Sequence, residues 1–213
     1  MSDVKKGILV VISGFSGAGK GTLIEALLKQ YDTYALSVSA TTRSPRPGEK
    51  DGVHYFFKTK EEFQTMIENA ELIEYAQYVE NFYGTPKEYV FGQLEAGKDV
   101  ILEIEIQGAL HVKEQFPEAM LIFITPPSAK ELYRRLVGRG TETPEVVANR
   151  MRRASEEAAY MAQYDYLVVN DRLEDAVREL HELIDAQHKT LSRNTSFVEK
   201  IQEELQEISE DAE

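Results

Sequence analysis

The sequence predicts an α/β protein, a P-loop three-layer sandwich in which helices cover both faces of a parallel central sheet. Three observations lead to this fold class. A glycine-rich loop ending in lysine follows an apolar run, apolar runs then alternate with amphipathic segments, and a polar, aromatic-rich stretch at 41–86 interrupts that alternation. At 213 residues the chain has the size of one such unit with a small inserted lobe.

Continuous apolar runs predict parallel strands, because a strand buried on both faces needs apolar side chains on both. We expect strands at residues 8–13, 35–40, 99–105, 119–125 and 166–169. We expect helices at residues 20–30, 106–114, 129–137 and 174–189. Capping residues mark helix starts at Ser128, Thr143 and Asp171, and Pro144 suits the first helical position.

The interrupting stretch has short segments of its own. Thr59 and Glu62 form a capping-box pattern that starts a helix, and residues 72–79 and 81–85 alternate like strands. We expect Ile73 and Tyr75 to form the apolar face of one strand, with Glu74 on the opposite face. The stretch therefore predicts a small mixed sheet, inserted where a second ligand could bind.

The glycine-rich loop predicts a nucleoside-triphosphate site. Glycines let backbone N–H groups surround an anion, the following helix presents its positive end, and the lysine can reach the outer phosphates. Its residues are Gly14, Phe15, Ser16, Gly17, Ala18, Gly19 and Lys20. The alternative is a βα turn without a ligand, since Gly-x4-Gly-Lys also occurs by chance.

The residues after the lysine are Gly21 and Thr22, so the hydroxyl comes one position later than in the usual pattern. A direct hydroxyl ligand to Mg²⁺ is therefore displaced or missing. Kinases of small nucleotides often have a loop of this type, in which phosphates and water hold the metal.

Composition excludes several classes of function. With 37 acidic and 24 basic residues, the net charge of -13 argues against a general nucleic-acid binder. The absence of cysteine excludes disulfides and thiolate zinc sites. No apolar run reaches the roughly 20 residues of a membrane helix, and the N-terminus leads into a core strand, so we expect a cytoplasmic protein without a membrane partner.

Basic residues nevertheless cluster in two stretches, 43–46 and 134–153. On an acidic protein such clusters predict small anionic ligands, because guanidinium groups match phosphate geometry. A solvated charged surface is the alternative.

Seven further stretches occur in order along the chain. They are residues 37–48, 52–57, 73–76, 83–85, 104–108, 135–142 and 168–171. Together with the glycine-rich loop, they resemble the guanylate kinase family from about residue 7 to residue 189. The resemblance implies transfer of the γ-phosphoryl group of ATP to GMP or dGMP, giving ADP and GDP, with Mg²⁺, in purine nucleotide metabolism.

The resemblance also implies an organisation into parts. The kinase core would comprise residues 7–40 and 86–189, with a helical lid at about 135–152 and a GMP-binding lobe at 41–85. Residues 190–213 lie outside it, and their spaced apolar residues among glutamates predict an acidic helix or tail. That segment leaves a homo-oligomer open as an alternative to packing on the core.

Roles carry over onto matching positions. ATP would bind residues 14–22 with Asn170 at the adenine, and Lys20, Arg43, Arg135, Arg139 and Arg150 would act in catalysis. The GMP site would comprise Ser39, Arg43, Arg46, Tyr55, Glu74, Tyr83, Thr85, Glu103 and Glu105. Thr22, Glu103 and Glu105 are candidates for Mg²⁺, directly or through water, and which of the two glutamates contacts GMP stays open.

Chemistry supports these roles. Guanine presents N–H donors that suit the Glu74 carboxylate and an O6 acceptor that suits the Ser39 hydroxyl. The GMP phosphate is already largely ionised, with a second pKa of about 6, so no general base is needed. The four histidines are then structural or surface residues, and Arg134, Arg152 and Arg153 are surface charges.

Two other functions compete with this interpretation. A non-catalytic guanylate-kinase-like interaction module would keep the fold but lose the phosphate loop, whereas Lys20 and the lid arginines are present here. A related sugar-phosphate kinase would not need Ser39 and Glu74 as a pair suited to a base.

Overall fold

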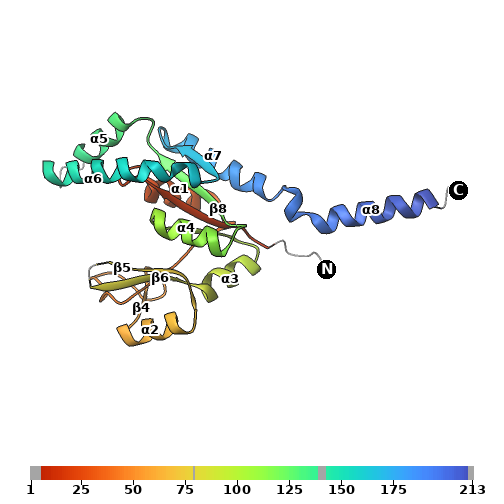
Figure 1. Cartoon of the computed structure of the whole chain (residues 1–213), viewed down its shortest axis with the longest axis horizontal. Helices are drawn as coiled ribbons and strands as arrows, with labels where there is room; N and C mark the ends of the chain where they lie inside the picture. The colour runs from red at the N-terminus through yellow and green to blue at the C-terminus, as the bar shows by residue number, and fades with distance from the viewer. Residues whose placement is uncertain (1–5, 79, 139–142, 211–213) are drawn as a thin grey trace.

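The computed structural model describes residues 6–78, 80–138 and 143–210, and the strands within them form two sheets (Figure 1). The larger sheet has the order β2-β7-β1-β8-β9, and all its neighbouring strands are parallel. Its strands are β1 (Leu9–Gly14), β2 (Tyr34–Leu36), β7 (Asp99–Glu103), β8 (Met120–Thr125) and β9 (Tyr166–Val169). The predicted parallel sheet is confirmed.

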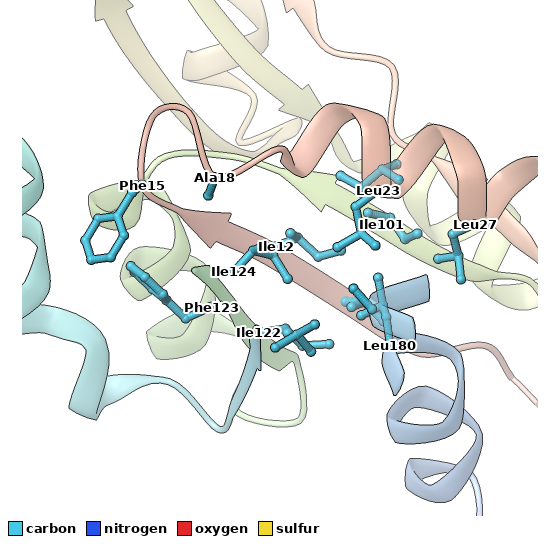
Figure 2. Close-up of a cluster of buried hydrophobic side chains, with 14 of the residues drawn as sticks. Ile12, Phe15, Ala18, Leu23, Leu27, Ile101, Ile122, Phe123, Ile124 and Leu180 are labelled. Atoms are coloured by element: carbon cyan, nitrogen blue, oxygen red, sulfur yellow. The ribbon is translucent and has the colours of Figure 1, made fainter. Parts of the chain in front are cut away.

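Helices cover both faces because successive strand residues point in opposite directions. Val10 and Ile12 of β1 pack toward α1 and α7, whereas Leu9 and Val11 pack toward α3 and α4. Figure 2 shows Ile12 among the side chains of the first core, including Leu23 and Leu27 of α1. The helices are α1 (Lys20–Gln30), α3 (Lys87–Glu95), α4 (Ile106–Gln115), α5 (Ala129–Gly138), α6 (Pro144–Glu157) and α7 (Leu173–Gln187). A 3-10 segment, η1 (Ala158–Gln163), connects α6 to β9.

The smaller sheet is mixed, as expected, and has the order β4-β3-β6-β5. Its strands are β3 (Ala40–Thr41), β4 (Phe56–Phe57), β5 (Leu72–Tyr78) and β6 (Asn81–Pro86), of which β3 and β4 are parallel and the other pairs antiparallel. Helix α2 (Lys60–Glu68) packs on this sheet and begins with the predicted capping box of Thr59 and Glu62. We call residues 40–86 the lobe.

Two local expectations are wrong. The strand predicted at 35–40 is divided: β2 ends at Leu36, and Ala40 begins β3, where it is buried in the small core of the lobe. The predicted cap at Asp171 does not form, because Arg172 is the N-cap of α7 and makes no side-chain cap bond. The caps at Ser128 and Thr143 do form.

The C-terminal segment begins with a short 3-10 helix, η2 (Leu191–Arg193), whose Arg193 Nη2 donates to the Lys6 and Gly7 carbonyls at 2.6 and 3.1 Å. Helix α8 (Thr195–Glu210) then projects away from the core (Figure 1), and its Phe197, Leu205 and Ile208 are exposed. Among the helices in the described residues, we find none with the length and apolar character needed to cross a bilayer.

Candidate active site

The glycine-rich loop joins β1 to α1 and takes its shape from left-handed glycines. Gly17 and Gly19 have φ angles of 92° and 88°, and Gly19 is the N-cap of α1. A Cβ on Gly19 would lie 2.6 Å from Asn170 Nδ2, so a side chain there would meet both strain and a clash. Phe15 anchors the loop by packing edge-on against Phe123, with ring centroids 5.0 Å apart (Figure 2).

Lys20 lies at the start of α1 and folds back over its own loop. Its Nζ donates to the carbonyl oxygens of Gly14 and Phe15 at 2.8 and 3.3 Å. Gly21 and Thr22 follow in the first turn of the helix, and both are exposed. The ammonium group is therefore held beside the hollow of the loop, where the positive end of the helix also favours an anion.

A second group of contacts supports the loop from β9 and α5. Asn170 is buried, and its Nδ2 donates to the Ala18 carbonyl at 2.9 Å. Arg135 reaches the same carbonyl through Nη1 at 3.3 Å and the Asn170 carbonyl through Nη2 at 2.9 Å. Glu131 holds the Nε of Arg135 at 2.8 Å, and hydrogen bonds from Arg134 first and Arg135 second lower the Glu131 pKa to about 2.

Helix α6, which packs beside α5, also reaches the loop. Arg150 Nη1 donates to the Ser16 hydroxyl oxygen at 2.7 Å, so this helix contacts the loop directly. Arg139, the remaining arginine expected in the lid, lies outside the described residues. Two of the three expected lid arginines, Arg135 and Arg150, therefore meet at the loop.

A cavity of about 540 Å³ lies between the glycine-rich loop, the end of β7, the start of α4 and α6. It is lined by Gly14, Ser16, Lys20, Glu103, Ile104, Glu105, Ile106, Arg150, Arg153 and Glu157. Glu103 is the last residue of β7, and Glu105 lies beyond the strand as the N-cap of α4. Both carboxylates therefore flank the cavity at the carboxyl end of the sheet, the edge at which ligands bind in open α/β folds.

The position of Arg153 differs from the expectation that it is a surface charge. Although its side chain is 60% exposed, it lines the cavity and is not a simple surface charge. Its Nη2 lies 3.1 Å from Glu105 Oε2, and its Nε lies 2.8 Å from Glu157 Oε1. The sequence signal for this position was its spacing from Arg150, since residues three apart lie on one helix face. Arg134 and Arg152 are exposed, as expected.

The lobe contributes a basic and aromatic cluster. The Arg43 guanidinium lies 5.3 Å from the Tyr55 ring centroid, and the Tyr55 and Tyr83 rings are 6.1 Å apart. Glu49 above all, and then Tyr83, raise the Arg43 pKa. The structure thus brings together three residues expected to bind a phosphate, while Arg46 lies in the same turn with an exposed side chain.

Glu49 completes this cluster and was not identified from the sequence. Its Oε2 and Oε1 accept from Arg43 Nη1 and Nη2 at 3.0 and 2.9 Å, and Oε2 also accepts from the Arg46 backbone N–H at 2.7 Å. Arg43 above all, and then the Arg46 N–H, lower the Glu49 pKa to about 2. Its only signal was an acidic residue directly after Gly48 in a basic stretch.

Glu74 is a half-buried carboxylate between the lobe and α4. Its Oε1 accepts from the hydroxyl of the fully buried Thr85 at 2.7 Å, and its Oε2 would lie 3.5 Å from a Cβ on Gly108 of α4. Burial raises the Glu74 pKa, the nearby charge of Glu105 raises it further, and the Thr85 hydrogen bond opposes both.

The strand that carries Glu74 does not alternate as expected. Ile73 is 1% exposed, whereas Tyr75 is 52% exposed, so the two do not share an apolar face. A register shift between Leu72 and Tyr75 in the β5–β6 pairing is the reason, since a bulge re-aims the residues within it. Ser39 lies between β2 and β3, half-buried, and its carbonyl accepts from the Phe56 N–H at 2.9 Å.

The histidines make structural contacts or are exposed. His181 shares a 2.7 Å hydrogen bond with Tyr34, His188 lies 2.9 Å from Asp99, and His54 accepts from the Lys50 N–H. His111 is exposed. Across the described parts of the chain, we find no group of three or more histidine, aspartate or glutamate side chains arranged to hold a metal.

Comparisons with known proteins agree on one family. The sequence profile of the family described as guanylate kinase matches residues 6–187. The chain is 55% identical over 186 residues to the guanylate kinase of Halalkalibacterium halodurans, covering 87% of this chain and 91% of the relative. It is 50% identical over 204 residues to that of Caldanaerobacter subterraneus subsp. tengcongensis, covering 96% and 99%.

The fold is similar to a solved structure as well. The crystal structure of guanylate kinase from Anaplasma phagocytophilum superimposes with a TM-score of 0.68 at 32% identity. The match covers 89% of this chain and 90% of that one.

Proposed function

This chain belongs to the guanylate kinase family, and from that premise we propose that the cavity between β7, α6 and the glycine-rich loop is where its phosphoryl transfer takes place. The chain is a kinase that transfers the γ-phosphoryl group of ATP to GMP, giving ADP and GDP. The proposals below assign this chemistry to its residues.

One observation carries the assignment of the site. A single cavity is lined by the lysine of the phosphate loop, by Glu103 and Glu105 at the end of the sheet, and by Arg150 of α6. Two highly charged phosphates must approach each other for the transfer, so catalysis consists of positioning and charge neutralisation. Cations supplied from two elements around one hollow suit that task.

In the proposed reaction, a phosphate oxygen of GMP attacks the γ-phosphorus of ATP while the bond to the leaving ADP oxygen breaks. The attacking oxygen carries no proton to remove, because the second pKa of a phosphate monoester is about 6. Lys20 exchanges its contacts with the Gly14 and Phe15 carbonyls for the outer phosphates. Arg135, Arg139 and Arg150 neutralise charge on the transferring group, and Asn170 lies at the adenine end.

The GMP phosphate is assigned to the cluster of Arg43, Arg46, Tyr55 and Tyr83. Arg43 has five N–H donors in a planar fork, and Glu49 and the Ser44 carbonyl engage only part of them. Glu49 thereby orients the fork toward the phosphate. Residues 41–85 would form the substrate lobe, residues 135–152 the lid, and the remainder of 7–189 the core.

Guanine is assigned to Glu74, with Ser39 for the O6 atom. The Thr85 hydrogen bond occupies one carboxylate oxygen of Glu74, and the other can accept from guanine N1–H or the N2 amine. Adenine presents no such donor pair, so the second oxygen of the half-buried Glu74 carboxylate would be left without a hydrogen bond and AMP would be disfavoured.

Mg²⁺ is assigned to the phosphates of ATP, with Glu103 or Glu105 and the Thr22 hydroxyl contributing through water. The fit rests on the two carboxylates that line the cavity beside Lys20, since Mg²⁺ prefers oxygen ligands and keeps several waters. When bound, the ion would neutralise phosphate charge. We further propose that the protein acts in the cytoplasm, in purine nucleotide metabolism, without a nucleic-acid or membrane partner.

Substitution of Glu74 tests the guanine assignment. Glu74→Gln replaces an acceptor-only oxygen with an amide that donates on one side. We expect kcat/KM for GMP to fall by about 10- to 100-fold, the effect of a charge-assisted hydrogen bond. IMP lacks the N2 amine, so its loss should be smaller and the preference for GMP over IMP should narrow. An unchanged GMP/IMP ratio would place the specificity carboxylate elsewhere, at Glu103 or Glu105.

A further inference from the structure

Arg153 is the basic residue of the cavity to which the family resemblance assigns no role. It lies on α6 one turn after Arg150, and the two side chains point to different parts of the same cavity. Arg150 contacts Ser16 of the phosphate loop, whereas Arg153 contacts Glu105 at the start of α4. One face of the lid helix therefore spans from the ATP side of the cavity to the carboxylates of the GMP side.

Arg153 contacts one oxygen of the Glu105 carboxylate and is itself anchored by Glu157. Arg153 Nη2 donates to Glu105 Oε2 at 3.1 Å, and its Nε donates to Glu157 Oε1 at 2.8 Å. Glu157 is only 18% exposed and sits on the same helix, so it anchors the base of the guanidinium. Glu157 above all, and then Glu105, raise the Arg153 pKa, and the side chain stays charged.

Glu105 has a second acidic neighbour on the substrate side. Burial raises the pKa of Glu74 most, and the negative charge of Glu105 raises it further. Both also adjoin α4, because Glu105 is its N-cap and Gly108 gives Glu74 its space. Figure 1 shows α4 between the lid helix α6 and the lobe strands β5 and β6. Arg153, bonded to Glu105, therefore contacts the start of the helix that borders Glu74.

We propose that Arg153 is a positioning residue for GMP, which acts by orienting Glu105 and by tying the lid helix to the acidic side of the GMP site. Arg153 occupies Oε2 of Glu105 and leaves Oε1 to accept a hydrogen bond from GMP. The inference rests on the proposed function, and it adds a residue outside the motifs that identified the family.

The test is a double-mutant cycle on Arg153 and Glu105. The enzymes are the wild type, Arg153→Gln, Glu105→Gln and the double variant, with KM for GMP, KM for ATP and kcat measured for each. Arg152→Gln is the matched control, because Arg152 directly precedes Arg153 on the helix, is exposed and does not line the cavity. Its side chain donates to Asn149 of the same helix, so the substitution removes a contact that lies away from the cavity. Circular dichroism checks that all variants are folded.

We expect Arg153→Gln to raise KM for GMP by about two- to five-fold, the scale of a charge pair that is more than half exposed. KM for ATP should change less than KM for GMP, Arg152→Gln should match the wild type, and Arg153→Lys should recover part of the loss. In the Glu105→Gln background, Arg153→Gln should add nothing, because the group through which it acts is already neutral.

Two results would overturn the inference: equal KM values for Arg153→Gln and Arg152→Gln, or the full effect of Arg153→Gln persisting in the Glu105→Gln background. These failures are distinct from a failure of the proposed function. If the wild type did not phosphorylate GMP, the proposed function itself would be wrong.

Discussion

The Glu49 carboxylate accepts two hydrogen bonds from the Arg43 guanidinium, from Nη1 at 3.0 Å and from Nη2 at 2.9 Å. A carboxylate of the protein therefore holds the arginine that is assigned to the GMP phosphate. The same carboxylate accepts from the Arg46 N–H at 2.7 Å. One acidic side chain thus organises the whole basic turn. It explains how a stretch without regular secondary structure between β3 and β4 can present a defined anion site.

The first prediction concerns this carboxylate. Glu49→Ala should raise KM for GMP by about three- to ten-fold, because Arg43 then samples many rotamers before it binds phosphate. Glu49→Gln keeps one acceptor and should lose less. KM for ATP is the internal control, and an unchanged KM for GMP in Glu49→Ala would show that Glu49 does not organise the site.

The second prediction concerns pH. Burial raises the Glu74 pKa and the Thr85 hydroxyl opposes that rise, so Thr85→Val should raise the Glu74 pKa further. GMP binding needs the ionised carboxylate and is lost as pH falls through this pKa. The acid limb of kcat/KM for GMP should therefore lie at higher pH in Thr85→Val than in the wild type.

The titration of GMP itself is common to both proteins and cancels in this comparison. Glu49 cannot produce the limb, since its pKa is lowered to about 2 and its charge is lost only as pH falls toward that value. Coincident acid limbs in the two proteins would contradict the assignment of Glu74 as the base-binding group.

The third prediction concerns the phosphate loop lysine. Lys20→Ala should reduce kcat by at least about 100-fold, the scale of losing one charge-stabilising donor. The fold should persist, because the ammonium contacts carbonyls of its own loop and Lys20 is not part of the buried apolar core. Single-turnover rates and circular dichroism separate the two effects, and turnover near the wild-type rate would remove Lys20 from catalysis.

The fourth prediction compares two glycines of the same loop. Gly19→Ala should destabilise the protein by about 1–3 kcal/mol, because φ is 88° and the added Cβ would lie 2.6 Å from Asn170 Nδ2. Gly21 is the matched control, since a Cβ there meets nothing within 4 Å and the position is helical. Urea denaturation measures both, and equal midpoints would contradict the strain assigned to Gly19.

Local sequence patterns were sufficient to predict much of this fold. Apolar runs located the parallel strands, and glycine with lysine located the loop, because both signals depend on neighbours in sequence. Long-range geometry was not accessible in the same way. The bulge that exposes Tyr75 arises from pairing between β5 and β6, and the division of residues 35–40 arises from Ala40 packing with Phe63.

The same distinction applies to the site. Motif residues such as Arg43 and Glu74 could be named from the chain, whereas Glu49 and Arg153 could not. Each of the latter acts through a partner: Glu49 through a turn that closes on Arg43, and Arg153 through Glu105, 48 positions away. From sequence alone, a charged residue in a basic or helical stretch is predicted to be a solvated surface residue. Its partner becomes known only from the fold.

The central claim is that this cavity transfers phosphate from ATP to a guanine monophosphate. The most direct measurement is ADP release by the wild-type protein, with ATP and Mg²⁺ constant and GMP, dGMP, AMP, CMP or UMP as the acceptor. We expect turnover with GMP and dGMP and a kcat/KM at least about 100-fold lower with the other three, because none of them presents the adjacent N1–H and N2 amine donors of guanine to Glu74. Comparable rates with AMP and GMP would contradict the account.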